Sequence, residues 1–264
     1  MKKLFNTFWS IWVWLSSYVL MMVSASLAIA LTPWRPFRKT HNWLGGAGMA
    51  GCLTLTGSRY RFIYDPAYDP TIRSVYAQNH VSVMDGHIAC AVIPHSFCGL
   101  HNHWHFRLPG YGWIMKLASG IPVYPHASGR TAEITEAARN RVNDLGISIL
   151  VFPEGHRTRD GKVGPFKRGT MFMARDAGIP VVPIAVRGMD KVNRKGSMRI
   201  WADQEVVIYI GRQYETTGLE TDEDVTAFTE KIRKIIADFA DDGKLPAGVV
   251  DTGEHTPNPR LQLA

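Results

Sequence analysis

Two almost uninterrupted apolar runs, at residues 147–152 and 179–187, constrain the fold of this chain more than any other feature. Each run follows a helix-like stretch that ends at a glycine, Gly146 in the first case and Gly178 in the second. Apolar runs of this length are typical of strands that are covered on both faces of a parallel sheet. Because parallel strands need helical crossovers, the sequence predicts an α/β fold with a mixed, mostly parallel sheet flanked by helices.

The remaining patterns continue this alternation of strands and helices. Further strands are expected at residues 72–77, 95–100, 120–124 and 205–210. Helices are expected at residues 85–92, 110–118, 131–145, 167–177 and 221–239. The last helix carries an apolar stripe at helical spacing, which favours packing against the sheet. These segments predict one domain at residues 57–240, followed by a polar tail at residues 241–264.

The amino-terminal region, residues 1–56, has a different character. No charged side chain occurs between Lys3 and Arg35, and an apolar stretch of more than about 18 residues is long enough to cross a bilayer. Three alternatives remain open: a spanning or deeply embedded helix, a signal peptide cleaved near residues 28–30, and an amphipathic interfacial helix that forms a hairpin with residues 43–55. We expect this region to anchor the protein to a membrane.

The charge balance indicates an anionic partner. The chain has 30 basic and 23 acidic residues, a formal net charge of +7. Such a balance suits nucleic acid, a membrane surface or a phosphorylated substrate, and it does not choose among them. The three cysteines, Cys52, Cys90 and Cys98, are odd in number and lack metal-ligand spacing. We therefore expect buried or free thiols instead of a disulfide framework.

His80 and Asp85 form the most informative pair of side chains. An imidazole with a nearby carboxylate can take a proton from a hydroxyl. On one continuous helix, five positions correspond to about 500°, so the two side chains would point roughly 140° apart. They converge only where the chain changes conformation, and the pair lies between a predicted strand at 72–77 and a predicted helix at 85–92. The sequence therefore predicts a site at a strand-to-helix corner, where α/β proteins bind their ligands.

A second polar cluster, residues 152–158, directly follows the apolar run at 147–152. Glu154 offers an acceptor for hydroxyl groups, and Gly155 permits a tight turn or a close approach of a ligand. Arg157 offers a planar fork that matches phosphate geometry. Further cations follow in the sequence: Arg159, Lys162, Lys167 and Arg168.

Three alternating histidines, His101, His103 and His105, would share one face of a strand and would then form a possible zinc patch. No carboxylate or cysteine nearby supports such a site. A polar loop near a membrane explains these residues more simply, and we expect no metal in this protein.

The chain resembles the glycerolipid acyltransferases of the lysophosphatidic acid acyltransferase type. The resemblance lies in His80 and Asp85, which match a His-x-x-x-x-Asp motif, and in residues 152–157, which match Phe-Pro-Glu-Gly-x-Arg. Residues 179–184 resemble the family's late apolar motif, and residues 112–123 lie where its second motif is expected. The similarity covers residues 60–239 in the family's order and spacing.

Two positions depart from the family's pattern. The family's second motif ends with an arginine just after its strand, whereas this chain has Tyr124-Pro125-His126 there. Arg130 is the nearest arginine and is a candidate substitute, because it precedes a predicted helix whose backbone amides favour an anion. His156 stands where the family has threonine. These departures concern the identity of the acceptor more than the reaction.

The resemblance implies transfer of a fatty acyl group from a thioester to the sn-2 hydroxyl of 1-acylglycerol-3-phosphate, giving phosphatidic acid. His80 would be the general base, oriented by Asp85, with backbone amides of residues 81–86 stabilising the oxyanion. Arg157, with Arg130 and Lys167, would hold the acceptor phosphate, while Glu154 and Gly155 would contact the rest of the acceptor.

This reaction needs no cofactor besides acyl-CoA or acyl carrier protein as the acyl donor. Its partners would be the lysolipid, the donor and a membrane, not nucleic acid. We expect the protein in the bacterial inner membrane, with its catalytic domain facing the cytoplasm. One alternative changes the acceptor to another lysophospholipid or an acylated amino-acid lipid. Another alternative is a non-catalytic, membrane-bound protein that binds anions.

Overall fold

A seven-stranded sheet forms the centre of the structure, a computed structural model that describes residues 2–36, 41–107, 111–124 and 130–253. The strand order is β1-β7-β6-β2-β5-β3-β4. The strands are β1 (Arg59–Tyr64), β2 (Val75–Gln78), β3 (Phe97–Asn102), β4 (Ile121–Val123), β5 (Ser148–Val151), β6 (Val181–Arg187) and β7 (Glu205–Ile210). Only β6 and β7 pair antiparallel among these neighbours. The predicted mixed, mostly parallel sheet is therefore confirmed.

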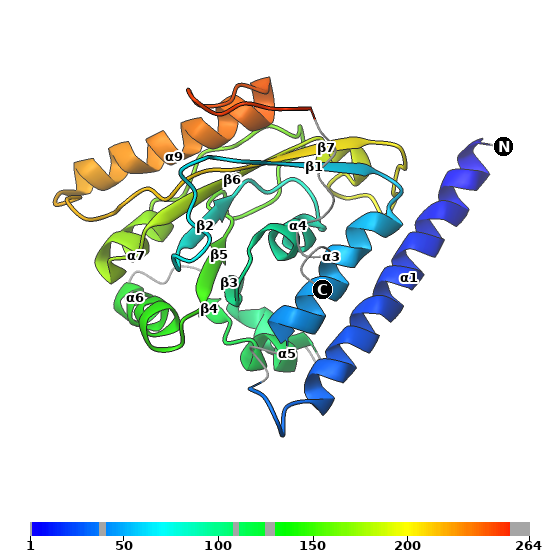
Figure 1. The fold of residues 1–264 in the computed structure, drawn as a ribbon, viewed down its shortest axis with the longest axis horizontal. Coiled ribbons are helices and arrows are strands. Elements are labelled where there is room, and N and C mark those ends of the chain that lie inside the picture. The colour runs from blue at the N-terminus through cyan, green and yellow to red at the C-terminus, as the bar shows by residue number, and fades with distance from the viewer. Residues whose placement is uncertain (1, 37–40, 108–110, 125–129, 254–264) are drawn as a thin grey trace.

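Helices cover both faces of this sheet, as Figure 1 shows. On one face lie α1 (Lys2–Ala30), α3 (Gly46–Leu55) and α4 (Asp85–Val92). On the other face lie α6 (Thr131–Arg139), α7 (Gly169–Ala177) and α9 (Asp222–Asp242). The remaining helical segments are short: α5 (Tyr111–Leu117), α8 (Met189–Val192), two π-helical turns (His41–Gly45 and Asn140–Asp144) and a 3₁₀ helix (His103–Arg107).

The central strands bury alternate side chains in two separate cores. On β2, Val75 and Ala77 join the core beneath α6, α7 and α9, while Tyr76 joins the opposite core. On β5, Ile149 and Leu150 divide in the same way. Burying each such large side chain contributes roughly 1.5–3 kcal/mol relative to exposure. This two-sided burial explains why these strands read as continuous apolar runs.

Strand β1 was not anticipated from the sequence. It contains Arg59 and Arg61, which interrupt any apolar run, and it lies at the edge of the sheet. Arg61 forms ion pairs with Glu205 and Asp251, so its charge is balanced at this edge. Edge strands commonly carry charged residues, because the charge discourages pairing with another chain.

The last helix, α9, begins and ends at well-defined signals. Thr221 caps its amino terminus, and the side chain of Asp224 accepts a hydrogen bond from the Thr221 backbone in return. The helix ends at Asp242 and is capped by Gly243, which adopts a φ of +73° that other residues rarely tolerate. The helix thus extends past the predicted boundary at residue 241. The predicted helix at 131–145 instead ends at Arg139 and continues as a π-helical turn.

Helices α1 and α3 lie side by side as a hairpin (Figure 1). Gly48 permits their close approach, since a Cβ atom there would lie 2.1 Å from the Oγ atom of Ser24. The opposite face of α1 exposes large apolar side chains, among them Phe8, Ile11, Trp12, Leu15, Val19 and Met22. By length and composition, residues 4–30 are able to span a membrane.

Candidate active site

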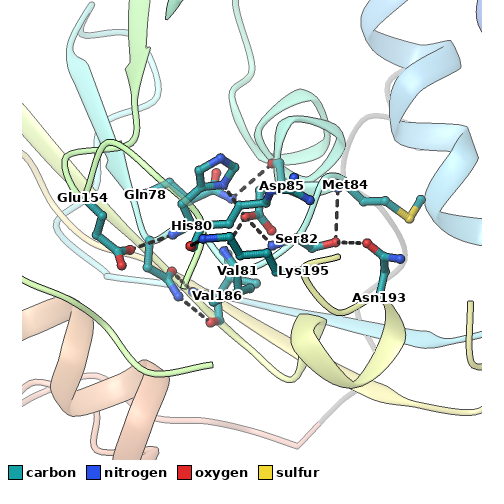
Figure 2. A network of polar contacts seen from close by, with 12 residues as sticks. Gln78, His80, Val81, Ser82, Met84, Asp85, Glu154, Val186, Asn193 and Lys195 are labelled. Atoms are coloured by element: carbon teal, nitrogen blue, oxygen red, sulfur yellow. Dashed lines mark hydrogen bonds and ion pairs between the residues drawn. The ribbon is translucent and has the colours of Figure 1, made fainter. Parts of the chain in front are cut away.

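His80 and Asp85 meet at the corner between β2 and α4, as Figure 2 shows. The Nδ1 atom of His80 lies 2.7 Å from the Oδ2 atom of Asp85. Strand β2 ends at Gln78 and α4 begins at Asp85, so the chain changes direction between the two side chains. We refer to residues 80–85 as the catalytic turn. The sequence spacing of His80 and Asp85 required a change of backbone conformation between them, and this turn provides it.

Asp85 is fully buried and is held by the backbone of its own turn. Its Oδ2 atom accepts hydrogen bonds from the amides of Val81, at 2.7 Å, and Ser82, at 2.9 Å. Burial raises the pKa of Asp85 above its ordinary value, and the hydrogen bonds from His80, Ser82 and Val81 oppose this rise. Three donors on one oxygen suit a carboxylate. We therefore assign the proton of His80 to Nδ1, which leaves Nε2 as the basic nitrogen.

The ring of His80 is further fixed by its contact with Phe152. The two rings stack with their centroids 4.1 Å apart and their planes inclined by 20°. The side chain of His80 retains 23% of its exposure, so the imidazole is accessible while its orientation is set. A base held in one orientation can meet a substrate hydroxyl without a further ordering cost.

Glu154 links the turn after β5 to the catalytic turn. Its Oε1 atom accepts a hydrogen bond from the His80 amide at 2.8 Å, and its Oε2 atom accepts one from the Gly164 amide at 3.0 Å. Glu154 is only 2% exposed, and burial raises the pKa of its carboxyl group. Glu154 thus holds His80 through the backbone, and contact with an acceptor's glycerol stays a prediction.

Gly155, Arg157 and Lys167 surround the same turn. Gly155 has a φ of +73°, and a Cβ atom there would lie 2.5 Å from the Nζ atom of Lys167. The carbonyl group of Arg157 accepts a hydrogen bond from Lys195. The guanidinium of Arg157 makes no ion pair or hydrogen bond with another described residue. Lys167 thus lies beside the turn that contains Arg157, and the Thr158 amide of this turn donates to the His80 carbonyl at 2.8 Å.

Arg130 is placed apart from this cluster. It precedes α6, and its guanidinium lies 4.3 Å from the ring centroid of Tyr124, just beyond the edge strand β4. Strands β5 and β3 separate β4 from β2, which leads to His80. Pro125 and His126, which follow Tyr124 in the sequence, lie outside the described residues. The predicted contact of Arg130 with the acceptor therefore stays a prediction.

Several supporting residues escaped the sequence analysis. Asn79 bonds to both the amide and the carbonyl of Val186, at 2.8 and 2.9 Å, which ties the end of β2 to β6. Gln78 donates to the carbonyl of Asp85 at 3.1 Å. Ser82 donates to Asn193 at 3.1 Å (Figure 2). Their position, as two adjacent polar residues at the end of a buried strand, was the signal that could have pointed to Gln78 and Asn79.

The three alternating histidines do not share one strand face. His101 lies on β3, whereas His103 and His105 lie on the following 3₁₀ helix. The ring of His103 stacks on Tyr124 with a centroid distance of 4.6 Å. The strand geometry on which the zinc alternative depended is therefore wrong, because the strand ends at Asn102.

Comparison with known proteins gives a consistent result. The acyltransferase family matches residues 63–187, a range that includes the catalytic turn and the turn after β5. This central part of the chain is similar to the acyltransferase family. The chain is 31% identical over 136 residues to "1-acyl-sn-glycerol-3-phosphate acyltransferase BAT2, chloroplastic" from Brassica napus, covering 52% of this chain and 39% of the relative. It is 27% identical over 175 residues to a 1-acyl-sn-glycerol-3-phosphate acyltransferase from Cocos nucifera, covering 66% and 56%.

These matches span less than two thirds of each relative's length. The fold is also similar to the crystal structure of the 1-acyl-sn-glycerophosphate acyltransferase PlsC from Thermotoga maritima. The TM-score is 0.72 at 20% identity, covering 89% of this chain and 95% of that one. The resemblance drawn from the sequence motifs is confirmed at the level of family and fold. Tyr124 and His156 remain positions at which the chain departs from the motifs expected of that family.

Proposed function

We propose that this acyltransferase moves a fatty acyl group from an acyl thioester to the sn-2 hydroxyl of 1-acylglycerol-3-phosphate, giving phosphatidic acid. The observation that carries the proposal is the 2.7 Å contact between His80 and Asp85, beside a turn that presents Arg157 and Lys167. The relatives are named as 1-acyl-sn-glycerol-3-phosphate acyltransferases, which supports the same reaction. The donor is acyl-CoA or acyl carrier protein, and no further cofactor takes part.

His80 acts as the general base. Its Nε2 atom takes the proton of the acceptor hydroxyl as the oxygen attacks the thioester carbonyl. Asp85 holds Nδ1 and stabilises the imidazolium, which then returns the proton to the departing thiolate. General-base help of this kind is worth roughly 10² to 10⁴ in rate. The attack is direct and forms no acyl-enzyme.

The oxyanion of the tetrahedral intermediate needs donors near the catalytic turn. The amides of Val81 and Ser82 are engaged by Asp85, and the amide of Met84 donates to Ser82. The amides of Val83 and Gly86 have no hydrogen-bond partner among the described residues. A Cβ atom on Gly86 would meet nothing within 4 Å. Open space beside a free amide suits an oxyanion, and one such donor is worth roughly 10²-fold or more.

The acceptor phosphate binds to Arg157 and Lys167 in this proposal. Arg157 supplies two parallel N–H groups, and Lys167 supplies a compact charge over Gly155. Arg130 is a third ligand only if it leaves the ring of Tyr124, against which it packs.

A second acceptor class is favoured by one specific observation. Where the family's second motif ends with arginine, this chain has Tyr124, with Arg130 packed against its ring. A headgroup with less negative charge, such as another lysophospholipid or an acylated amino-acid lipid, needs fewer cations. The non-catalytic alternative gains no such support, because binding an anion does not require the arrangement of His80 and Asp85.

The apolar face of α1 supports a membrane as the location of the proposed reaction. Exposed side chains such as Phe8, Trp12 and Leu15 give α1 a continuous apolar surface that suits lipid, where both the lysolipid and the acyl chain reside. We propose the bacterial inner membrane, with the catalytic domain facing the cytoplasm. Sedimentation of the purified protein with lipid vesicles is the direct measurement.

An acyl-transfer assay with a panel of acceptors tests the proposal. The purified full chain receives labelled acyl-CoA or acyl carrier protein together with 1-acylglycerol-3-phosphate, other lysophospholipids or an acylated amino-acid lipid. We expect labelled phosphatidic acid, with transfer lost in His80→Ala while the circular dichroism spectrum is retained. Transfer to a different acceptor would replace the substrate assignment. Full activity of His80→Ala would refute the mechanism.

A further inference from the structure

The segment at residues 193–200 runs between the catalytic turn and helix α1. It follows the short helix α8 and precedes β7. We call it the clasp segment. Asn193 at its start and Ile200 at its end are both fully buried, although the segment has no regular secondary structure. A buried irregular segment must satisfy its polar groups with specific partners.

At one end, the clasp segment holds the catalytic turn. The Oδ1 atom of Asn193 accepts a hydrogen bond from the hydroxyl of Ser82 at 3.1 Å (Figure 2). That hydroxyl accepts from the amide of Met84 at 3.2 Å, and the amide of Ser82 donates to Asp85 at 2.9 Å. Asn193 is therefore two side chains away from His80, and it touches none of the reacting atoms.

Asn193 is also tied to its own segment. Its Nδ2 atom donates to the carbonyl groups of Ser197, at 3.0 Å, and Arg199, at 3.1 Å. Both amide hydrogens and the amide oxygen thus have partners. A buried amide with every hydrogen bond satisfied has one low-energy orientation.

At the other end, the clasp segment binds α1. The amide of Ile200 donates to the hydroxyl of Ser10 at 2.9 Å, and the indole N–H of Trp14 donates to the carbonyl of Met198 at 2.6 Å. Ser10 and Trp14 are four positions apart, so they project from the same face of α1. This face is opposite to the exposed apolar one.

We propose that Asn193 is a positioning residue for acyl transfer and that the clasp segment fixes the catalytic turn to α1. Hydrogen bonds run from Asp85 through Ser82 and Asn193 to Ser197 and Arg199, and the adjoining backbone of Met198 and Ile200 bonds to Trp14 and Ser10 of α1. The inference rests on the acyl transfer proposed above. A displacement of about 1 Å at a reacting group can cost about 10²-fold in rate. Loss of one of these hydrogen bonds should therefore produce a measurable decrease in kcat.

Substitution at the catalytic end tests the role of Asn193. In vesicles of defined composition, we expect Asn193→Ala and Ser82→Ala each to lower kcat at least tenfold, with KM for both substrates within twofold of wild type. The double variant should be no slower than the slower single variant, because both remove the same link. A loss confined to KM, or additive losses in kcat, would overturn the positioning role.

Substitution at the α1 end remains informative even if Asn193→Ala folds poorly. Ser10→Ala removes the acceptor for Ile200, and Trp14→Phe removes the donor to Met198 while keeping an aromatic ring. Ser16→Ala is the matched control, since among the residues that the structure describes the hydroxyl of Ser16 bonds only to Trp12 and Val13 of its own helix. We expect kcat to fall at least threefold in the first two variants and to stay unchanged in Ser16→Ala, with equal vesicle binding in all three.

The outcomes separate this inference from the proposed function. If the wild-type protein transfers no acyl group, the proposed function fails. If His80→Ala abolishes transfer while Ser10→Ala and Trp14→Phe match Ser16→Ala, then only the coupling to α1 fails.

Discussion

The carboxylate of Glu154 accepts a hydrogen bond from the backbone amide of His80 at 2.8 Å. This contact joins the two motifs that hold the proposed site residues, and it does so through the backbone of His80, not through its side chain. The other oxygen of Glu154 binds the amide of Gly164. The acid of the second motif therefore positions the proposed base of the first.

Replacing Glu154 with glutamine should weaken both activity and stability. Glutamine has only one side-chain oxygen that can accept a hydrogen bond. The backbone N–H group of either His80 or Gly164 would therefore face the NH2 group of the glutamine side chain. An unsatisfied buried donor costs about 1–3 kcal/mol, and the displaced His80 should lower kcat by roughly 10- to 100-fold. Steady-state kinetics and urea denaturation measure the two effects. Wild-type kcat in this variant would show that His80 is held without Glu154.

The stability of this variant should also differ from wild type in its pH dependence. Burial raises the pKa of Glu154 above its ordinary value of 4.5, so the folded state holds the proton more tightly than the unfolded state. This contribution is present below about pH 4.5 and is lost as the pH rises through the folded pKa. The stability advantage of wild type over Glu154→Gln should therefore shrink toward neutral pH. If the difference in free energy of unfolding between wild type and Glu154→Gln increased toward neutral pH, the upward direction of the Glu154 pKa shift would be wrong.

Asp85→Asn tests how much the carboxylate of Asp85 contributes while the imidazole of His80 is still present. An asparagine can place its oxygen where Oδ2 lies and keep the hydrogen bonds from Val81 and Ser82, but it carries no charge that would stabilise the imidazolium. We expect kcat to fall by roughly 10³- to 10⁴-fold, with KM little changed. Because His80 is retained, residual transfer should exceed that of His80→Ala. Equal residual rates in the two variants would show that His80 has no catalytic value without its carboxylate.

Arg157→Gln should act through the acceptor phosphate. A hydrogen bond to a charged group contributes roughly 1.5–3 kcal/mol, so KM for a phosphorylated lysolipid should rise by about 10- to 100-fold. KM for an unphosphorylated monoacylglycerol and for the donor should stay unchanged. Lys191→Gln, an exposed cation on α8, is the matched control for the loss of one charge. A uniform rise for both acceptors would assign Arg157 to another part of the lipid.

His87 should make the fold sensitive to acid. It is buried on α4, and burial lowers its pKa from 6.5 to about 4. The folded state therefore excludes a proton that the unfolded state binds. Stability is complete above about pH 6.5 and is lost progressively as the pH falls toward 4, by about 3 kcal/mol in total. Urea denaturation of wild type and His87→Leu across this range should show a smaller loss in the variant.

The short-range features of this protein were predictable because neighbouring residues decide them. Helix α4 begins at Asp85 and ends at Val92, and β7 runs from Glu205 to Ile210, as the sequence predicted. The apolar run at 147–152 appears as β5 because both of its faces are covered. The corner that brings His80 to Asp85 followed from a spacing that no single helix can satisfy.

The strands with mixed composition were harder to predict. Arg59 and Arg61 concealed the strand character of β1, whose pairing with β7 sets Arg59 opposite Glu205, far away in the sequence. The expected strand face for His101, His103 and His105 failed because the backbone tightens into a 3₁₀ helix after Asn102. Local composition does not report such a change of backbone geometry.

The sequence by itself determined the resemblance to a family, the alternation of strands and helices, and the choice of the candidate base and its carboxylate. Only the tertiary structure decided which groups hold them. Glu154 reaches His80 across 74 residues, Asn193 reaches Ser82 across 111, and Ser10 reaches Ile200 across 190. The physical reason is that propensity and periodicity act over a few residues, whereas a hydrogen bond depends on positions in space that the packing of the whole sheet sets.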